Sequence, residues 1–221
     1  RDAGIERFIY AGSSAIYGDN SDLPKVEDVV GKPLSPYAAT KHANELYAGV
    51  FAATYDMECI GLRYFNVFGS RQDPEGAYAA VIPRWIGELS NCTVPTIFGD
   101  GKSSRDFCYI DNVIEANLLA ACEENPDSVN QVYNIACGVS TTLNQLYEMI
   151  RNSLIRFQPG TAKIQPYYRD FRTGDVRYSE ADISKAKKIL GYIPAYDVSK
   201  GLNETVRWFV ENMPRRQNSK T

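Results

Sequence analysis

Apolar residues along this chain fall into two kinds of run, and the two kinds alternate. Short continuous runs, such as 8–11 and 59–65, are bounded by glycine, serine or polar residues, as in strands that are buried on both faces. Longer segments repeat their apolar residues every three or four positions, as amphipathic helices do. Strands that alternate with helices predict an α/β fold with a largely parallel sheet.

The same pattern predicts the order of the elements. A first helix is expected over residues 37–55, with Ser35 as its N-cap and Pro36 in its first turn. Two short strands around a glycine turn are expected within 96–110, and another strand over 131–136. Further helices are expected near 79–90, 111–125, 141–154, 182–190 and 200–212, with Asp111 and either Thr141 or Thr142 as N-caps.

The start of the first helix places Tyr37 and Lys41 four positions apart, so both side chains lie on one helix face. A tyrosine in a model peptide titrates near pH 10, and about 4 kcal/mol of phenolate stabilisation is needed before it becomes a base at neutral pH. A lysine ammonium ~4 Å away supplies roughly this amount at an effective dielectric constant of ~20. The pair is a candidate for proton transfer, although an ordinary solvated helix face can show the same spacing.

A second candidate feature is the pair of serines, Ser13 and Ser14, which follows the apolar run 8–11. A hydroxyl at the carboxyl end of a strand lies where open α/β sheets bind ligands. The alternative interpretation is a glycine/serine turn without chemistry. Ser13, Tyr37 and Lys41 together favour the catalytic interpretation over the turn and the surface lysine.

Composition excludes several other classes of function. A net charge of -3 and a pI near 5.3 argue against a nucleic-acid-binding surface, which needs a basic patch. The apolar runs are far shorter than the ~20 residues of a membrane-spanning helix, so no membrane partner is expected. Five scattered cysteines and a single histidine argue against disulfides and against a metal site, and they favour reduced thiols in the cytoplasm.

The chain resembles a known family through six motifs. They are AGSSAIYGD, SPYAATKHANELY, GLRYFNVFG, GAYAAVIPRW, FGDGKSSRDFCYIDNV and DFRTGDVRYSEADISKA, in this order. With them the chain resembles the extended short-chain dehydrogenase/reductase family, specifically its nucleotide-sugar 4-epimerases and most closely bacterial UDP-N-acetylglucosamine (UDP-GlcNAc/GalNAc) 4-epimerases. The resemblance implies the C-terminal part of a doubly wound (Rossmann-type) parallel sheet, interleaved with a smaller substrate-binding lobe.

The resemblance also implies a cofactor, NAD, a UDP-sugar substrate and a transient 4-keto sugar. Ser13 would hydrogen-bond the sugar 4-hydroxyl and relay its proton. Tyr37 would be the base that removes this proton. Lys41 would hold the nicotinamide ribose and favour the ionised form of the tyrosine.

Further residues are assigned to binding by the resemblance alone, and ordinary packing or surface ion pairs are the alternative for each of them. The assignments are Phe65 and Val67 against the nicotinamide, Ser14 beside the sugar, Asn66 on the substrate phosphate side, Ala80 and Val81 with backbone groups for the nucleotide and Trp85 nearby, Arg105 and Arg172 on the pyrophosphate, Asp175 on the uridine ribose, and Ser179 at the sugar.

Three positions bear on the reaction and on the sugar. The related 4,6-dehydratases place acidic residues directly after the serine or threonine of the first loop, whereas this chain has Ser14 and Ala15 there. Neither side chain can do such acid–base work, so the epimerase reading is favoured over a dehydratase or decarboxylase. The small Ser179 lies where larger residues in the family exclude N-acetylated sugars, which leaves room for an acetamido group.

The sequence departs from the family at its beginning, because no GxxGxxG turn follows a strand anywhere. Residues 1–70 are therefore expected to be the second half of an NAD-binding domain, and residues 71–221 mainly a nucleotide-sugar-binding lobe that is interleaved with sheet elements. The 221 residues alone are expected neither to hold NAD tightly nor to turn over. A homodimer is expected for an intact protein, and a non-catalytic remnant is the alternative.

Overall fold

The structure, a computed structural model, describes residues 1–76, 80–172 and 176–212. The chain forms two compact units. Unit 1 consists of residues 1–67, 104–140 and 176–197, and unit 2 of residues 68–103, 141–175 and 198–221. The assignment of residues 1–70 to NAD binding and of 71–221 to sugar binding stays a prediction.

The helices and strands follow one another in alternating groups along the chain. The helices are α1 (Pro36–Tyr55), α2 (Val81–Ser90), α3 (Ile110–Cys122), α4 (Leu143–Ile155), α5 (Ser184–Leu190) and α6 (Val198–Asn212). The strands are β1 (Arg7–Ser13), β2 (Glu58–Tyr64), β3 (Asn66–Phe68), β4 (Thr96–Phe98), β5 (Ser104–Tyr109), β6 (Gln131–Ile135), β7 (Ser140–Thr142) and β8 (Tyr167–Arg169). Short 3₁₀ turns are η1 (Ser14–Tyr17), η2 (Pro126–Ser128) and η3 (Pro159–Lys163).

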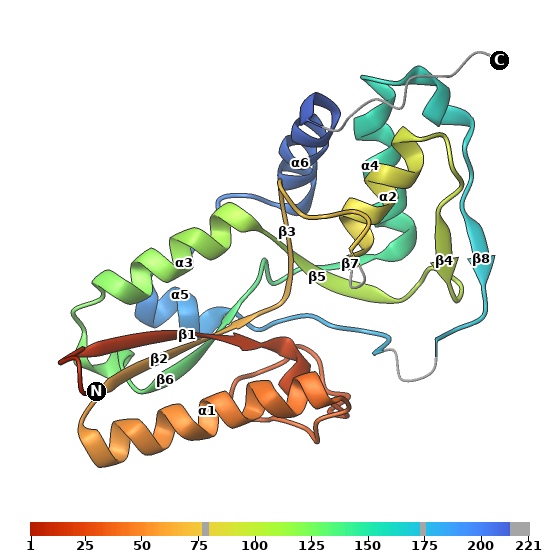
Figure 1. Ribbon diagram of the computed structural model, residues 1–221. Coiled ribbons are helices and arrows are strands. Elements are labelled where there is room, and N and C mark those ends of the chain that lie inside the picture. The colour runs from red at the N-terminus through yellow and green to blue at the C-terminus, as the bar shows by residue number, and fades with distance from the viewer. Residues whose placement is uncertain (77–79, 173–175, 213–221) are drawn as a thin grey trace. The chain divides into compact units, whose positions relative to one another are not determined.

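The centre of unit 1 is a parallel sheet with the strand order β1-β2-β6. Helix α1 covers one face of this sheet, and α3 and α5 lie on the other (Figure 1). Five successive residues of β2, 59–63, are buried, because this central strand has neighbours on both sides and helices on both faces. This arrangement confirms the predicted α/β fold. A further three-stranded sheet has the order β3-β5-β7.

Helix α1 begins where its sequence predicts. The Ser35 hydroxyl accepts a hydrogen bond from the Ala38 backbone N–H at 3.1 Å, and Pro36 occupies the first helical position. The helix ends at Asp56 in a left-handed conformation, with a φ of 55°. All residues of α1 are described, and the buried ones among them are Ala38 and Ala48. The helix therefore lies on the sheet through small side chains.

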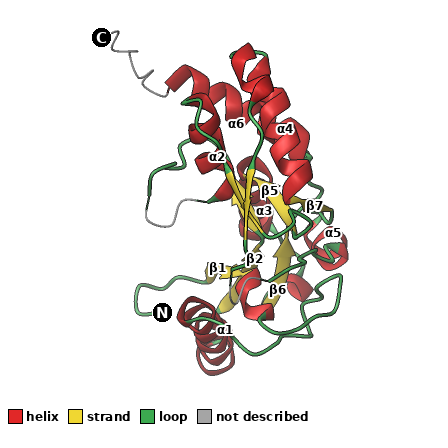
Figure 2. Ribbon diagram, turned by 90° about the vertical axis from the view of Figure 1, so that its right-hand side faces the viewer, coloured by secondary structure: helices red, strands yellow, loops and turns green. Residues whose placement is uncertain are grey.

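Unit 2 contains helices α2, α4 and α6 and the two-stranded parallel pair β4 and β8. Figure 2 shows α4 and α6 side by side, and contacts link α2 to both of them. The core of the unit is built around Trp85 of α2, whose ring meets the ring of Tyr147 edge-on at 6.1 Å. The indole N–H of Trp85 donates to the backbone carbonyl of Thr96 at 3.3 Å, which joins α2 to β4.

Some predicted details were wrong or incomplete. Asp111 is not the N-cap of α3, because β5 runs directly into this helix with Tyr109 at the cap position. Asp111 lies in the first turn instead, where a carboxylate is favourable to the positive end of the helix. Thr142 is the cap of α4, as one of the two predicted alternatives. The short strands β3, β7 and β8 were not predicted.

Candidate active site

Ser13 is the last residue of β1, and its side chain is nearly buried. Its backbone is extended, with a φ of -156°, and its hydroxyl oxygen accepts a hydrogen bond from the Ala15 backbone N–H at 3.2 Å. The serine thereby caps η1, the 3₁₀ turn that follows it. Because the hydroxyl oxygen is the acceptor in this bond, the hydroxyl proton remains available to a ligand.

Lys41 connects the first turns of α1 to the same end of β1. Its ammonium donates to the backbone carbonyl of Ala11 at 3.0 Å, two residues before Ser13. The ammonium also lies 5.8 Å from the ring centroid of Tyr37, one helical turn earlier. The Tyr37 side chain is 56% exposed, so its phenol is open to a ligand. The strand end carrying the serine and the helix start carrying the tyrosine and lysine are thus adjacent in unit 1.

The other predicted residues of unit 1 differ in how accessible they are. Phe65 is buried in the core, where its ring lies 6.0 Å from the ring of Tyr17. Ser14 and Val67 are partly exposed, and Asn66 is exposed. Their binding roles stay predictions, and Phe65 has an evident structural role as well.

Arg105 and Ser179 both lie at strand β5 of unit 1. The Arg105 guanidinium donates to the backbone carbonyls of Ser104 and Arg177, at 2.9 and 3.2 Å. Ser179 is nearly buried, and its backbone N–H donates to the carbonyl of Ser104 at 3.1 Å. The segment around Ser179 is therefore fixed against β5 by backbone hydrogen bonds.

Unit 2 contains the remaining predicted binding residues. Ala80 is exposed at the N-cap of α2, and Val81 is the first residue of that helix. Trp85 is a core residue of the unit. Asp175 lies outside the described residues.

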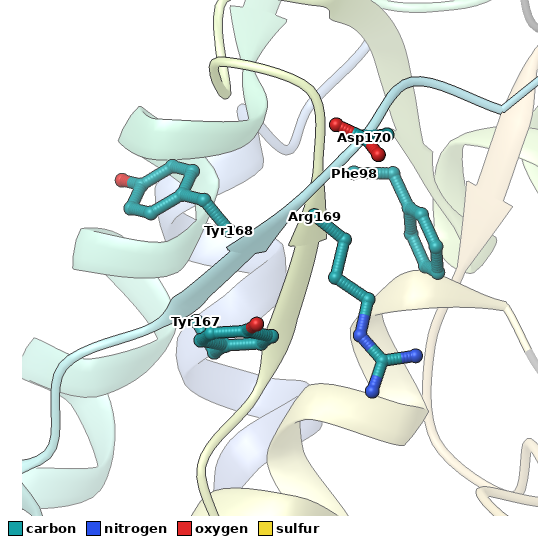
Figure 3. A pocket seen from close by; sticks show the side chains of 5 residues that line it. All are labelled: Phe98, Tyr167, Tyr168, Arg169 and Asp170. Atoms are coloured by element: carbon teal, nitrogen blue, oxygen red, sulfur yellow. The ribbon is translucent and has the colours of Figure 1, made fainter.

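A hollow of about 660 Å³ opens beside β4 and β8 of unit 2. Figure 3 shows the five side chains that line it: Phe98, Tyr167, Tyr168, Arg169 and Asp170. Arg172 follows them, and its guanidinium lies 3.8 Å from the ring centroid of Phe98. Aromatic rings beside two arginines suit a ligand that has both a flat ring and negative charge.

A family model described as the NAD dependent epimerase/dehydratase family matches residues 1–136. The chain belongs to this family. The family membership confirms the predicted resemblance.

Two relatives are similar to this chain in sequence. The putative UDP-glucose 4-epimerase of Methanocaldococcus jannaschii is 36% identical over 209 residues, which make up 94% of this chain and 64% of that protein. Human dTDP-D-glucose 4,6-dehydratase is 30% identical over 223 residues, or 98% of this chain and 60% of that protein. The chain thus spans just under two thirds of the length of these relatives.

Solved structures agree with the fold of this family member. UDP-N-acetylglucosamine 4-epimerase from Methanobrevibacter ruminantium M1, in complex with UDP-N-acetylmuramic acid, matches with a TM-score of 0.88 and 41% identity over 96% of this chain and 65% of that one. UDP-glucose 4-epimerase from Thermotoga maritima, with UDP-glucose, matches with a TM-score of 0.88 and 37% identity over 96% and 66%.

Three further observations concern the described residues. No helix among them is both long and apolar enough to cross a membrane. In the same part of the chain, no three His, Cys, Asp or Glu side chains gather in a way that could hold a metal ion. The five cysteines, all of which are described, are free thiols.

One residue near the site was missed by the sequence analysis. Arg63 lies in the middle of the apolar run that forms β2, and it is buried there. A charged residue inside a continuous apolar run is a signal that a buried partner exists, because an unpaired buried charge is very unfavourable. The sequence does not show which partner that is.

Proposed function

We propose that the complete protein is an NAD-dependent nucleotide-sugar 4-epimerase. The observation that carries this proposal is the hydrogen bond from the Lys41 ammonium to the Ala11 carbonyl, which brings the start of α1 to the strand end that carries Ser13. A hydroxyl, a phenol and an ammonium are thereby gathered around one strand end. These groups suffice to take a proton from a sugar hydroxyl and to give it back.

The residues at this strand end fit the nicotinamide riboside half of NAD. The Lys41 ammonium can donate to ribose hydroxyls, and the exposed Tyr37 phenol leaves room for a ring beside it. The sequence contains no GxxGxxG turn, so no residue is assigned to the pyrophosphate of the cofactor. When bound, NAD would accept a hydride from the sugar carbon and later return it.

The protein residues would handle the proton and the orientation of the sugar. Tyr37 takes the proton of the 4-hydroxyl while the carbon is oxidised, and Lys41 stabilises the phenolate that results. Ser13 donates a hydrogen bond from its hydroxyl to the same sugar oxygen and so orients it. After the keto sugar has turned its other face to the cofactor, Tyr37 returns the proton and the configuration at C4 is inverted.

A 4,6-dehydratase is the second candidate, because one relative is such an enzyme. That reaction also removes a proton from C5 and protonates the leaving hydroxyl at C6, which requires further acid–base groups. The residues after Ser13 are Ser14 and Ala15, and the Ala15 backbone N–H is engaged with the Ser13 hydroxyl. The chemistry of these positions therefore supports the epimerase.

In the decisive experiment, the complete gene product is incubated with NAD and one nucleotide sugar per reaction. The four sugars are UDP-GlcNAc, UDP-glucose, UDP-glucuronate and dTDP-glucose. We expect the 4-epimer of a UDP-sugar, detected by NMR, and no 4-keto-6-deoxy product. Tyr37→Phe should lower kcat by about 10²- to 10⁴-fold. Tyr47→Phe is the matched control, because Tyr47 is an exposed tyrosine of the same helix, and it should retain full activity. Equal activity of Tyr37→Phe and Tyr47→Phe would contradict the proposal.

We infer further that the preferred substrate is the pair UDP-GlcNAc and UDP-GalNAc. The inference is supported by the small, nearly buried Ser179 and by the 41% identity to a UDP-N-acetylglucosamine 4-epimerase. Ser179→Tyr should abolish turnover of N-acetylated sugars and spare that of UDP-glucose, as measured by kcat/KM on both. Ser179→Ala is the size-matched control. Equal loss on both sugars in the tyrosine variant would refute a role for Ser179 in sugar size.

A further inference from the structure

Arg63 forms a two-pronged ion pair across the boundary between the sheet and α1 in unit 1. Its Nε donates to Oε1 of Glu45 at 2.9 Å, and its Nη2 donates to Oε2 of the same carboxylate at 2.8 Å. The two side chains are only 5% and 11% exposed. This parallel geometry fixes the orientation of both groups as well as their distance.

The third nitrogen of Arg63 holds the loop that follows β1. Its Nη1 donates to the Tyr17 hydroxyl at 3.0 Å and to the backbone carbonyl of Glu27 at 2.7 Å. The Tyr17 hydroxyl in turn donates to Oδ1 of Asn134 in β6 at 2.6 Å. One cation therefore joins α1, η1 and two strands of the sheet.

Arg63, Glu45, Tyr17 and Asn134 form one buried cluster, and the ion pair keeps Arg63 charged in it. Burial disfavours the charged guanidinium, but the hydrogen bonds and the charge of Glu45 outweigh it, so the pKa of Arg63 is raised above its usual value. Burial raises the pKa of Tyr17 to about 12, so its hydroxyl keeps its proton at neutral pH. A buried ion pair adds little net stability, because removing the two charges from water offsets their attraction. Its best-attested use is to favour one packing arrangement of the elements over others.

The cluster contacts both segments that carry the catalytic candidates. Glu45 lies one helical turn after Lys41 and two turns after Tyr37. Gly12, directly before Ser13, pairs with Arg63 across the sheet, and a Cβ added there would lie 3.2 Å from the Arg63 Cγ. The buried residues of α1 are Ala38 and Ala48, and the Lys41 and Glu45 side chains add polar contacts to β1 and β2.

We propose that Arg63 and Glu45 are positioning residues that hold the Tyr37–Lys41 segment of α1 in register with the Ser13 strand end for proton transfer. This inference rests on the proposed epimerase function. Neither side chain touches the reacting atoms in this account. They act by fixing the positions of the Tyr37 phenol and the Lys41 ammonium relative to the Ser13 hydroxyl.

The test replaces Arg63 by lysine in the complete protein. A lysine keeps the charge but cannot bind both carboxylate oxygens and also reach Tyr17. We expect kcat to fall on the order of 10- to 100-fold, with KM for the UDP-sugar unchanged within about threefold. A loss in kcat with an unchanged KM is the signature of misplaced reacting groups, since a general loosening of the fold would weaken substrate binding as well.

Arg7→Lys is the matched control. Arg7 also belongs to the sheet and donates to a carboxylate, that of Glu58 at 2.8 Å, but its contacts are not on α1. This variant should keep the wild-type kcat and KM. A wild-type kcat in Arg63→Lys, or the same loss of kcat in both variants, would overturn the proposal.

A second readout separates this inference from the proposed function. Hydrogen–deuterium exchange should become faster in α1 of Arg63→Lys than in α1 of the wild type, and it should stay as in the wild type in Arg7→Lys. If the wild type epimerises none of the sugars, the proposed function fails while the exchange data still test the anchoring of α1. Where Arg63→Lys does not fold, Glu45→Gln takes its place. If neither variant folds, the pair serves stability alone and the positioning role is refuted.

Discussion

Asp106 has a fully buried carboxylate that fastens two backbone segments of unit 1. Its Oδ1 accepts the backbone N–H of Cys137 at 2.9 Å, and its Oδ2 accepts those of Gly138 at 2.9 Å and Ala181 at 3.3 Å. Burial raises the pKa of Asp106 to about 6, although these hydrogen bonds act in the opposite direction. The carboxylate is therefore easier to protonate in the folded chain than in the unfolded chain.

This pKa shift predicts how stability depends on pH. Below about pH 4 the group is protonated in both states, and between about pH 4 and 6 only the unfolded state releases the proton. The contribution of Asp106 to the free energy of unfolding should therefore be largest below pH 4 and should fall by about 3 kcal/mol by pH 7. The check is the difference in urea unfolding free energy between the wild type and Asp106→Asn at pH 4, 5, 6 and 7.

Asp182→Asn gives a control of opposite sign. The Asp182 carboxylate accepts hydrogen bonds from Ser184, which lower its pKa, so its contribution is present at neutral pH and is lost as the pH falls through the folded value. A difference between the wild type and Asp106→Asn that does not vary with pH would contradict the role given to Asp106.

The sequence could reveal some residues of the candidate site and not others. Tyr37 and Lys41 are one helical turn apart, so their relation is local and follows from the helix alone. The partners of Arg63 are not local. Glu45 lies 18 positions away in the sequence, and Tyr17 lies 46 positions away. Such a pairing depends on how a helix is placed on a sheet, which residue spacing does not encode.

Helix α4 begins with two reciprocal hydrogen bonds between Thr142 and Gln145. The Thr142 hydroxyl accepts the Gln145 backbone N–H at 3.2 Å, and the Gln145 side-chain carbonyl accepts the Thr142 backbone N–H at 2.9 Å. This arrangement is a capping box, and it satisfies backbone donors that have no partner within the helix. The sequence predicts a helix here with Thr141 or Thr142 as its cap, and the capping box decides for Thr142.

Loss of this cap should weaken unit 2. Thr142→Ala should lower the free energy of unfolding by about 1 kcal/mol, as measured by urea titration. Thr54→Ala is the matched control, because Thr54 is an exposed residue near the end of α1. It should be neutral or slightly stabilising, since alanine has the higher helix propensity. Equal effects of the two substitutions would show that the capping box contributes nothing.

The elements that were predicted and those that were missed differ in length and burial. Strand β2 shows as a continuous apolar run because the sheet and its helices bury it from all sides. Strand β8 has three residues, Tyr167 to Arg169, and all are exposed. Its backbone pairs with β4, which lies about 70 positions earlier in the sequence. A short exposed strand that is held only by backbone bonds to a distant strand shows no hydrophobic pattern in its own sequence.

The outer face of α1 bears on the assembly of the complete protein. Leu46, Tyr47 and Val50 are 63%, 69% and 58% exposed on this helix. Neighbouring exposed apolar side chains of this size are typical of surfaces that are covered in an assembly. The family resemblance implies a homodimer for an intact protein, and we propose that two copies of the complete protein pair through this face of α1.

Leu46→Glu should therefore convert a dimer of the complete protein into a monomer, because it places a charge in an apolar interface. The measurement is the molar mass by light scattering coupled to size-exclusion chromatography. Ile193→Glu is the matched control, since Ile193 is 68% exposed and lies outside α1. It should leave the dimer intact. A monomeric wild type, or a dimer in both variants, would mean that this face of α1 is not the surface through which two copies pair.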